Sequence, residues 1–164
     1  MPANVSFSLR ALDPADLPAV ERVHTASIRG LCGEAYDAET LERWAANPDG
    51  KRYQRMLQPG NLCLVALMPA GEICGFGSLQ IEKARLASLF VHPDQAGTGV
   101  GALLLARLEA LAREAGLDQL HVESSLNAQS FYARHGFELN RRGKYCMSTG
   151  LSMECAEMTK PLRD

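Results

Sequence analysis

The chain has 164 residues, of which 46% are hydrophobic, and a formal net charge of −2. This length suffices for one sizeable core but not for two ordinary domains, so we expect a single domain over residues 1–164. The near-neutral charge and the lack of any block of Lys and Arg argue against a nucleic-acid binder, which needs a concentrated basic face. A small-molecule or peptide partner fits this composition better.

Cysteine and histidine usage gives no sign of a metal site. The five cysteines are widely spaced and include no Cys-x-x-Cys pair, and the four histidines show no metal-ligand spacing. Such cysteines indicate reduced thiols rather than disulfides or zinc ligands. Residues 1–14 lack a basic head followed by an apolar run, and no segment approaches the ~20 apolar residues of a membrane span. We therefore expect a cytoplasmic protein with no metal and no membrane contact.

The N-terminal part of the chain is typical of a short strand followed by helices. Residues 7–11 can form the strand, and Asp13-Pro14 is a good helix start, because aspartate caps an N-terminus and proline fits the first turn. We expect His24 to be partly buried on the apolar face of this helix. A second helix is expected from Asp37 onward, and a short third one over residues 51–57.

Two aromatic residues in this region carry no decided role. Trp44, the only tryptophan, could line a pocket together with Tyr36. An aromatic residue on an amphipathic helix is more often part of the core, so both interpretations stay open.

The pattern changes to strands after Pro59-Gly60. Residues 62–68 and 73–81 are apolar, β-prone runs joined by Pro69-Ala70-Gly71-Glu72, which predicts a hairpin, and residues 84–91 form the next strand. This part of the chain is expected to be antiparallel.

A helix with one apolar stripe is predicted over residues 100–115, and residues 117–123 return as a strand. Because a helix crosses over between them, this strand and the one before the helix should run parallel. A further helix over residues 125–134 and final strands over 137–140 and 153–160 complete the expected elements. Gly143 and Gly150 are expected in the last connection.

The loop between the strand at residues 84–91 and the helix at 100–115 carries glycines at positions 97, 99 and 101. The first turn of a helix offers unpartnered N–H groups and a positive dipole end, and glycines let the backbone approach an anion closely. The loop is therefore a candidate phosphate cradle. It lacks the Gly-Lys-Ser/Thr of a P-loop, and its spacing differs from the Gly-x-Gly-x-x-Gly of a dinucleotide site. The alternative is a tight turn with no ligand.

Val91-x-Pro93, followed by Gly97-x-Gly99-Val100-Gly101 and Leu103-Leu104, resembles the acetyl-CoA signature of the GNAT acetyltransferase superfamily. The usual form of that signature is Arg/Gln-x-x-Gly-x-Gly/Ala. Ala96 stands at the Arg/Gln position, and Gln95 lies one residue too early. This departure concerns the side chain at the pyrophosphate, not the amides of the cradle.

A second stretch resembles the GNAT element Asn-x-x-Ala-x-x-Phe/Leu-Tyr-Glu-x-x-Gly-Phe. The residues in register are Ala128, Phe131, Tyr132, Gly136 and Phe137. Ser125 and Ala133 occupy the places of its usual asparagine and glutamate, and Asn127 is shifted by two. Two partial matches in the family's order, covering roughly residues 62–137 together with the hairpin, are far more specific than one.

The resemblance implies an α+β fold, the GNAT fold, in which a central mixed, mostly antiparallel sheet has splayed parallel central strands and is flanked by helices. It implies acetyl transfer from acetyl-CoA, as cosubstrate, to an amine. The pantetheine arm would enter the gap between the splayed strands, and the pyrophosphate would lie on the glycine amides. The implied cofactor-binding residues are Leu89, Phe90, Val91, Ala96, Gly97, Thr98, Gly99, Val100, Gly101, Ala102, Asn127 and Tyr132.

The family register also implies catalytic roles. Tyr132 is the candidate general acid for the departing thiolate, the alternative being a ring that only packs against the cofactor. The amide of Leu89 or Val91 could polarise the thioester carbonyl. Many members carry a glutamate base on the strand before the cradle, but that strand contains no carboxylate here. Glu82 and Glu123 are the candidate bases, each acting through water, and a solvated surface carboxylate is the alternative for each.

Two other functions stay open. The first is a non-catalytic acyl-CoA-binding module, which Ala96 and the missing strand glutamate keep in play; the second is an interaction module without CoA. Tyr132 favours the enzyme. Residues 19–46 and 141–158, which usually shape the acceptor site in this superfamily, show no decisive charge cluster. The resemblance implies a small-molecule or peptide amine as acceptor, but the sequence does not identify it; the oligomeric state is open, with a homodimer as one option.

Overall fold

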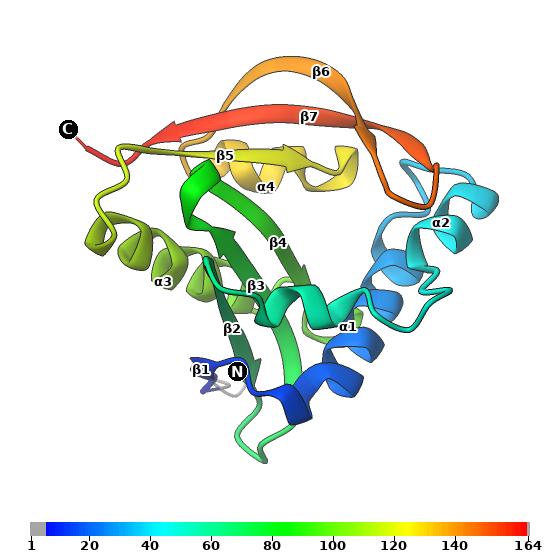
Figure 1. The fold of residues 1–164 in the computed structure, drawn as a ribbon, viewed down its shortest axis with the longest axis horizontal. Helices are drawn as coiled ribbons and strands as arrows, with labels where there is room; N and C mark the ends of the chain where they lie inside the picture. The colour runs from blue at the N-terminus through cyan, green and yellow to red at the C-terminus, as the bar shows by residue number, and fades with distance from the viewer. Residues whose placement is uncertain (1–5, 164) are drawn as a thin grey trace.

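The computed structural model describes residues 6–163. The expectation about residues 1–14 therefore lies partly outside the described residues. The helices and strands of the chain are joined by loops and short 3₁₀ turns (Figure 1). In chain order they are β1 (Ser8–Ala11), α1 (Leu17–Leu31), α2 (Ala38–Ala45), β2 (Asn61–Leu67), β3 (Ile73–Gln80), β4 (Arg85–Val91), α3 (Val100–Glu114), β5 (Gln119–Ser124), α4 (Gln129–Arg134), β6 (Glu138–Cys146) and β7 (Ser152–Pro161).

The strands form one seven-stranded mixed sheet with the order β1-β2-β3-β4-β5-β7-β6. β4 and β5 run parallel, and the other neighbouring pairs of the described chain are antiparallel. The parallel pair arises because α3 crosses over between its two strands. The predicted hairpin, the parallel pair and the mostly antiparallel sheet are confirmed.

The two parallel strands are paired over only two residues each, at the start of β4 and in the middle of β5. The register joins Arg85 to His121 and Leu86 to Val122, and it records no later pair between these strands. Beyond this point β4 stays paired with β3, and β5 stays paired with β7, so the two halves of the sheet diverge (Figure 1). The sheet therefore has a gap in its middle, at the C-terminal ends of β4 and β5.

Helix α3 covers one face of the sheet and builds the larger core. Leu104, Leu105 and Leu108 of this helix are buried against the strands. The helix comes close because Gly77 on β3 has no side chain: a Cβ there would lie 2.7 Å from Cδ1 of Leu108. The opposite face is covered mainly by α1, with α2 beside it. Strands β2 and β3 are thus buried on both faces, which explains their nearly continuous apolar sequence.

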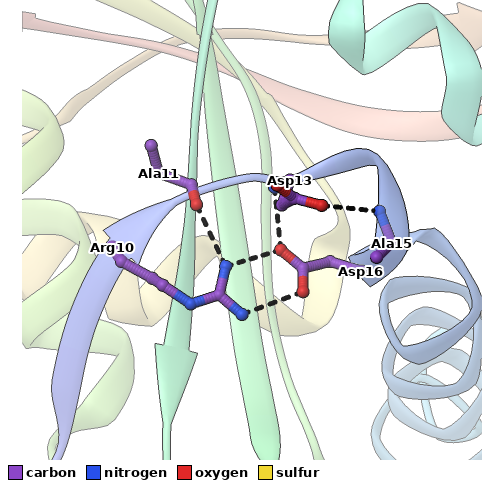
Figure 2. Close-up of polar contacts among 5 residues, drawn as sticks. All are labelled: Arg10, Ala11, Asp13, Ala15 and Asp16. Carbon is purple, nitrogen blue, oxygen red and sulfur yellow. Dashed lines mark hydrogen bonds and ion pairs between the residues drawn. The ribbon is translucent and has the colours of Figure 1, made fainter.

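The start of α1 is tied to β1 by a bidentate ion pair (Figure 2). Arg10 donates from Nη1 and Nη2 to the two carboxylate oxygens of Asp16, at 2.6 and 2.9 Å. The same carboxylate accepts the N–H of Asp13, and the Asp13 side chain accepts the N–H of Ala15, which completes a capping box. Asp13 is a cap as predicted, but it caps a 3₁₀ turn that precedes α1.

Several predicted boundaries are wrong. Residues 51–57 contain a 3₁₀ helix, Tyr53–Leu57, instead of an α-helix, and residues 125–134 divide into a 3₁₀ turn and the short α4. The strand expected at 137–140 continues to Cys146, so Gly143 lies inside β6 and only Gly150 lies in the connection. β6 is an edge strand whose sequence is polar, and its pairing with β7 from Glu138 to Cys146, interrupted by one bulge between Leu139 and Arg141, is what holds it extended.

Across the described chain, helices are too short or too polar to span a lipid bilayer. The five cysteines are free thiols.

Candidate functional site

The glycine loop follows β4 and leads directly into α3. A 3₁₀ turn, Pro93–Gln95, is held by the His92 imidazole, which accepts the N–H of Asp94 at 3.1 Å, and by the Thr98 hydroxyl, which donates to the Gln95 carbonyl at 2.6 Å. Gly97 and Gly99 then adopt φ values of 79° and 93°, in the left-handed region that favours glycine. The expected sequence of strand, glycine loop and helix is present.

The loop presents backbone N–H groups that find no acceptor in the described part of the chain. Gly99 is the N-cap of α3 but supplies no capping side chain. A Cβ built on Gly97 or Gly99 would meet nothing within 4 Å, so the space beside the loop is open. Within residues 6–163, no backbone or side-chain acceptor meets the N–H groups of Gly97, Gly99, Val100, Gly101 and Ala102. These donors stand at the positive end of the helix dipole and fit a phosphate group.

The neighbouring strand offers a second row of free backbone groups. The N–H of His92 donates to the Cys74 carbonyl on β3 at 2.8 Å. Because backbone groups along a strand point alternately to its two edges, those of Leu89 and Val91 point away from β3, toward the gap. With β5 diverging, they have no strand to pair with. An extended chain bearing amides could fill this place.

A cavity of about 240 Å³ opens between the two diverging strands. The residues of the splayed strands that line it are Arg85, Leu86, Ala87, Ser88, Leu89, Phe90, Val122, Glu123 and Ser124. Tyr36 and Trp44 also line it, which agrees with the pocket interpretation, and Trp44 is at the same time buried. Each of the four tyrosines borders this space: Tyr36, Tyr53, Tyr132 and Tyr145.

Tyr132, the predicted acid, borders the cavity from α4. Its ring lies between Phe131 and Phe137, with 5.3 Å between ring centroids in both cases. The residue is only 4% exposed, and burial raises the pKa of its phenol, which therefore stays protonated at neutral pH. The phenol thus borders the cavity in the protonated form that a proton donor needs.

The two carboxylates predicted as bases lie in different surroundings. Glu123 lines the cavity and forms an ion pair with Arg85, whose Nη2 lies 3.2 Å from its Oε1. Glu82 lies in a 3₁₀ turn between β3 and β4, is exposed, and does not border the cavity. The structure thus brings Glu123 together with Tyr132 and leaves Glu82 outside.

Sequence reasoning missed the polar groups on the α1 side of the cavity. His24, expected only as a partly buried residue, is 5% exposed, and its Nδ1 lies 2.8 Å from the Tyr53 hydroxyl. Burial lowers the pKa of His24 to about 3, so the ring is neutral. Ser78 and Ser88 face each other across β3 and β4, with 2.6 Å between their hydroxyl oxygens. Polar residues within two apolar strands were the signal that could have found this pair.

The remaining predicted site residues are placed as follows. Ala96, Gly97, Thr98 and Gly99 are exposed on the loop, as an anion site requires. Asn127 is exposed in the turn before α4 and does not border the cavity. No grouping of His, Cys, Asp and Glu within the described range is arranged to hold a metal ion.

Comparisons with known proteins agree with this geometry. A family model for the acetyltransferase (GNAT) domain matches residues 32–158. A GCN5-related N-acetyltransferase from Rhodopseudomonas palustris is 32% identical, with a TM-score of 0.85 and 94% of each chain covered. The PaiA N-acetyltransferase from Thermoplasma acidophilum, solved in complex with coenzyme A, is 22% identical, with a TM-score of 0.72 over 95% of this chain and 99% of that one.

A curated relative, an uncharacterized acetyltransferase of Streptococcus pyogenes, is 35% identical over 71 residues, which are 40% of this chain. The match spans about half the length of that relative, 50%. The family match extends over most of the chain and includes the glycine loop, the strand gap and Tyr132. The chain therefore belongs to the GNAT acetyltransferase family.

Proposed function

We propose that this chain acts as a single GNAT domain that transfers the acetyl group of acetyl-CoA to a primary amine of a small molecule or peptide, by direct attack in a ternary complex. One observation carries the proposal. The gap between β4 and β5 and the free amides of the glycine loop lie at the same end of β4, so one elongated thioester could occupy both. A turn that merely reversed the chain would not need both features.

The cofactor half of the site is assigned to the loop and β4. The N–H groups of Gly97 and of Gly99 to Ala102 would bind the pyrophosphate, and the free backbone groups of Leu89 and Val91 would pair with the amides of the pantetheine arm. Ala96 and Thr98 donate their own N–H groups to the carbonyls of Pro93 and Gln95, and Phe90 pairs with Phe76 on β3, so contacts of these three residues with the cofactor would come mainly from their side chains. Asn127, which does not border the cavity, is the weakest member of the predicted set.

The chemistry requires a neutral amine, a polarised carbonyl and a proton for the leaving group. Acetyl-CoA supplies an activated acetyl group. The amine nitrogen forms a bond to the carbonyl carbon, and the carbon–sulfur bond breaks. The amide of Leu89 or Val91 donates to the carbonyl oxygen, and Tyr132 gives its hydroxyl proton to the departing thiolate.

The proton that leaves the amine is assigned to Glu123. This carboxylate borders the same cavity as Tyr132, whereas Glu82 points to solvent outside it. Glu123 would act through water, and its ion pair with Arg85 holds the carboxylate at the wall of the cavity. Tyr132 and Glu123 in one cavity favour an enzyme over a non-catalytic acyl-CoA-binding module.

The test is an acetyl-transfer assay with the purified chain, acetyl-CoA and pooled amines, with thiol release followed by mass analysis of the products. Thiol release that depends on an amine, together with an acetylated product, would support the proposal. Binding of acetyl-CoA without transfer to any amine would instead support the binding module. A chain that neither binds acetyl-CoA nor transfers acetyl groups would refute both.

A further inference from the structure

The cavity on the α1 side of the sheet carries more positive than negative charge. Its cationic lining residues are Arg52, Arg55 and Arg85, whereas Glu123 is its only carboxylate. Arg55 also has an ion-pair partner outside the cavity, Asp49, at 3.8 Å. The charge that remains unbalanced is therefore that of Arg52 and, in part, of Arg85.

Arg52 is a half-buried cation without a carboxylate partner. Its Nη1 donates to the carbonyls of Trp44 and Ala46, which hold the side chain in place but leave its charge uncompensated. Among the described residues, no carboxylate lies within 4 Å of the Arg52 guanidinium, and Glu21 attracts it only from a greater distance. Burial lowers the pKa of the guanidinium. Burying a cation without a partner is costly, unless a ligand supplies the counter-charge.

Arg85 provides a second free donor in the same place. Its buried Nε has no hydrogen-bond partner among residues 6–163, although Nη2 is paired with Glu123. The guanidinium of Arg85 lies over the ring of Tyr145, 5.7 Å from the centroid, and that of Arg52 lies over the ring of Tyr53, 5.9 Å from the centroid. Both arginines therefore border the same cavity as Glu123, the carboxylate proposed as the base.

We infer, on the basis of the proposed acetyl transfer, that the acceptor is a small primary amine carrying an anionic group such as a carboxylate, which Arg52 and Arg85 bind. Arginine is suited to this role because its planar donors match carboxylate geometry. The amino end of such a molecule would then lie toward Glu123. At about 240 Å³ the cavity is smaller than most drug-sized ligand sites, which favours a small amino acid over a long peptide.

The test compares amines that differ only in the anionic group. The probe pairs are γ-aminobutyrate with butylamine and β-alanine with propylamine, each assayed by thiol release. We expect kcat/KM to be about tenfold or more higher for the carboxylate member of each pair, the value of a charged hydrogen bond. Arg52→Gln should remove most of this preference, Arg52→Lys should retain part of it, and Arg22→Gln, an exposed position on α1, should keep all of it.

Equal use of both members of each pair would overturn the inference while leaving acetyl transfer established. A preference that survives in folded Arg52→Gln would overturn the role of Arg52, and acetyl-CoA binding without transfer to any probe would overturn the substrate class. If Arg52→Gln does not fold, the anion site can be tested by adding butyrate to the wild-type enzyme. Competitive inhibition of butylamine acetylation by butyrate would support the anion site, and no inhibition would contradict it. Failure to bind acetyl-CoA would instead refute the proposed function itself.

Discussion

Replacing Tyr132 by phenylalanine removes one hydroxyl and nothing else. The ring keeps its contacts with Phe131 and Phe137. Burial alone raises the pKa of the phenol, and the hydroxyl has no hydrogen-bond partner in the described chain, so no such bond is lost. The free energy of unfolding should therefore change by less than about 1 kcal/mol. Turnover should fall by about a hundredfold to ten-thousandfold, or about 3 to 5 kcal/mol in activation free energy, because a general acid is lost.

The assay separates chemistry from binding. Single-turnover rates with saturating acetyl-CoA report the chemical step, and calorimetric titration should give an unchanged Kd for acetyl-CoA. Tyr36→Phe is a matched control that should affect stability rather than chemistry. The Tyr36 hydroxyl donates to the Glu154 carbonyl at 2.6 Å and accepts the N–H of Leu126 at 2.9 Å. Loss of this hydroxyl should therefore lower the melting temperature more than the single-turnover rate. An unchanged single-turnover rate in Tyr132→Phe would remove Tyr132 from the role of acid.

Three further predictions follow from the same structure. Gly99→Glu should abolish acetyl-CoA binding, because it places a negative charge at the glycine loop that would hold the pyrophosphate. The matched control is Gly116→Glu, at another glycine with positive φ just after the C-terminal end of α3, and it should bind acetyl-CoA normally. Comparable calorimetric Kd values for the two variants would contradict the phosphate cradle. Glu123→Gln should lower the pre-steady-state rate at neutral pH by about a hundredfold or more, as expected for a lost general base, and Glu82→Gln should not; equal rates in both variants would exclude Glu123 as base. The pKa of buried His24 is about 3, whereas that of a histidine in the unfolded chain is about 6.5. As the pH falls through this interval, the unfolded state takes up a proton that the folded state does not. The free energy of unfolding should therefore fall by up to about 1.4 kcal/mol per pH unit between about pH 6.5 and about pH 3. The free energy of unfolding of His24→Gln, measured with urea, should depend less steeply on pH than that of the wild type. Equal pH dependence in the two proteins would refute the low pKa of His24.

The sequence predicted the part of the fold that local patterns determine. Apolar runs and turn residues located β2, β3 and β4. Because helix α3 connects β4 to β5, a parallel arrangement of these two strands could also be predicted. It could not predict the length of β6, whose polar residues form a strand only because β7 lies beside them. The left-handed Ala84, with φ 49°, likewise depends on the tight turn between β3 and β4 and left no mark in the sequence.

The site divides in a similar way. The glycine loop and Tyr132 stand in compact motifs, so spacing alone singled them out. The α1 side of the cavity brings together residues that are far apart in the chain, such as His24 with Tyr53 and Arg85 with Tyr145. No short motif records such contacts, and for this reason the acceptor side was not readable from the sequence.

The most direct test of the central claim is calorimetric titration of the wild-type chain with acetyl-CoA, free CoA and NADH. All three ligands carry a pyrophosphate, but only the first two carry a pantetheine arm that can pair with Leu89 and Val91 in the gap between the strands. Saturable binding of both CoA compounds and none of NADH is the predicted result. Binding of neither CoA compound would contradict it and reduce the glycine loop to a turn.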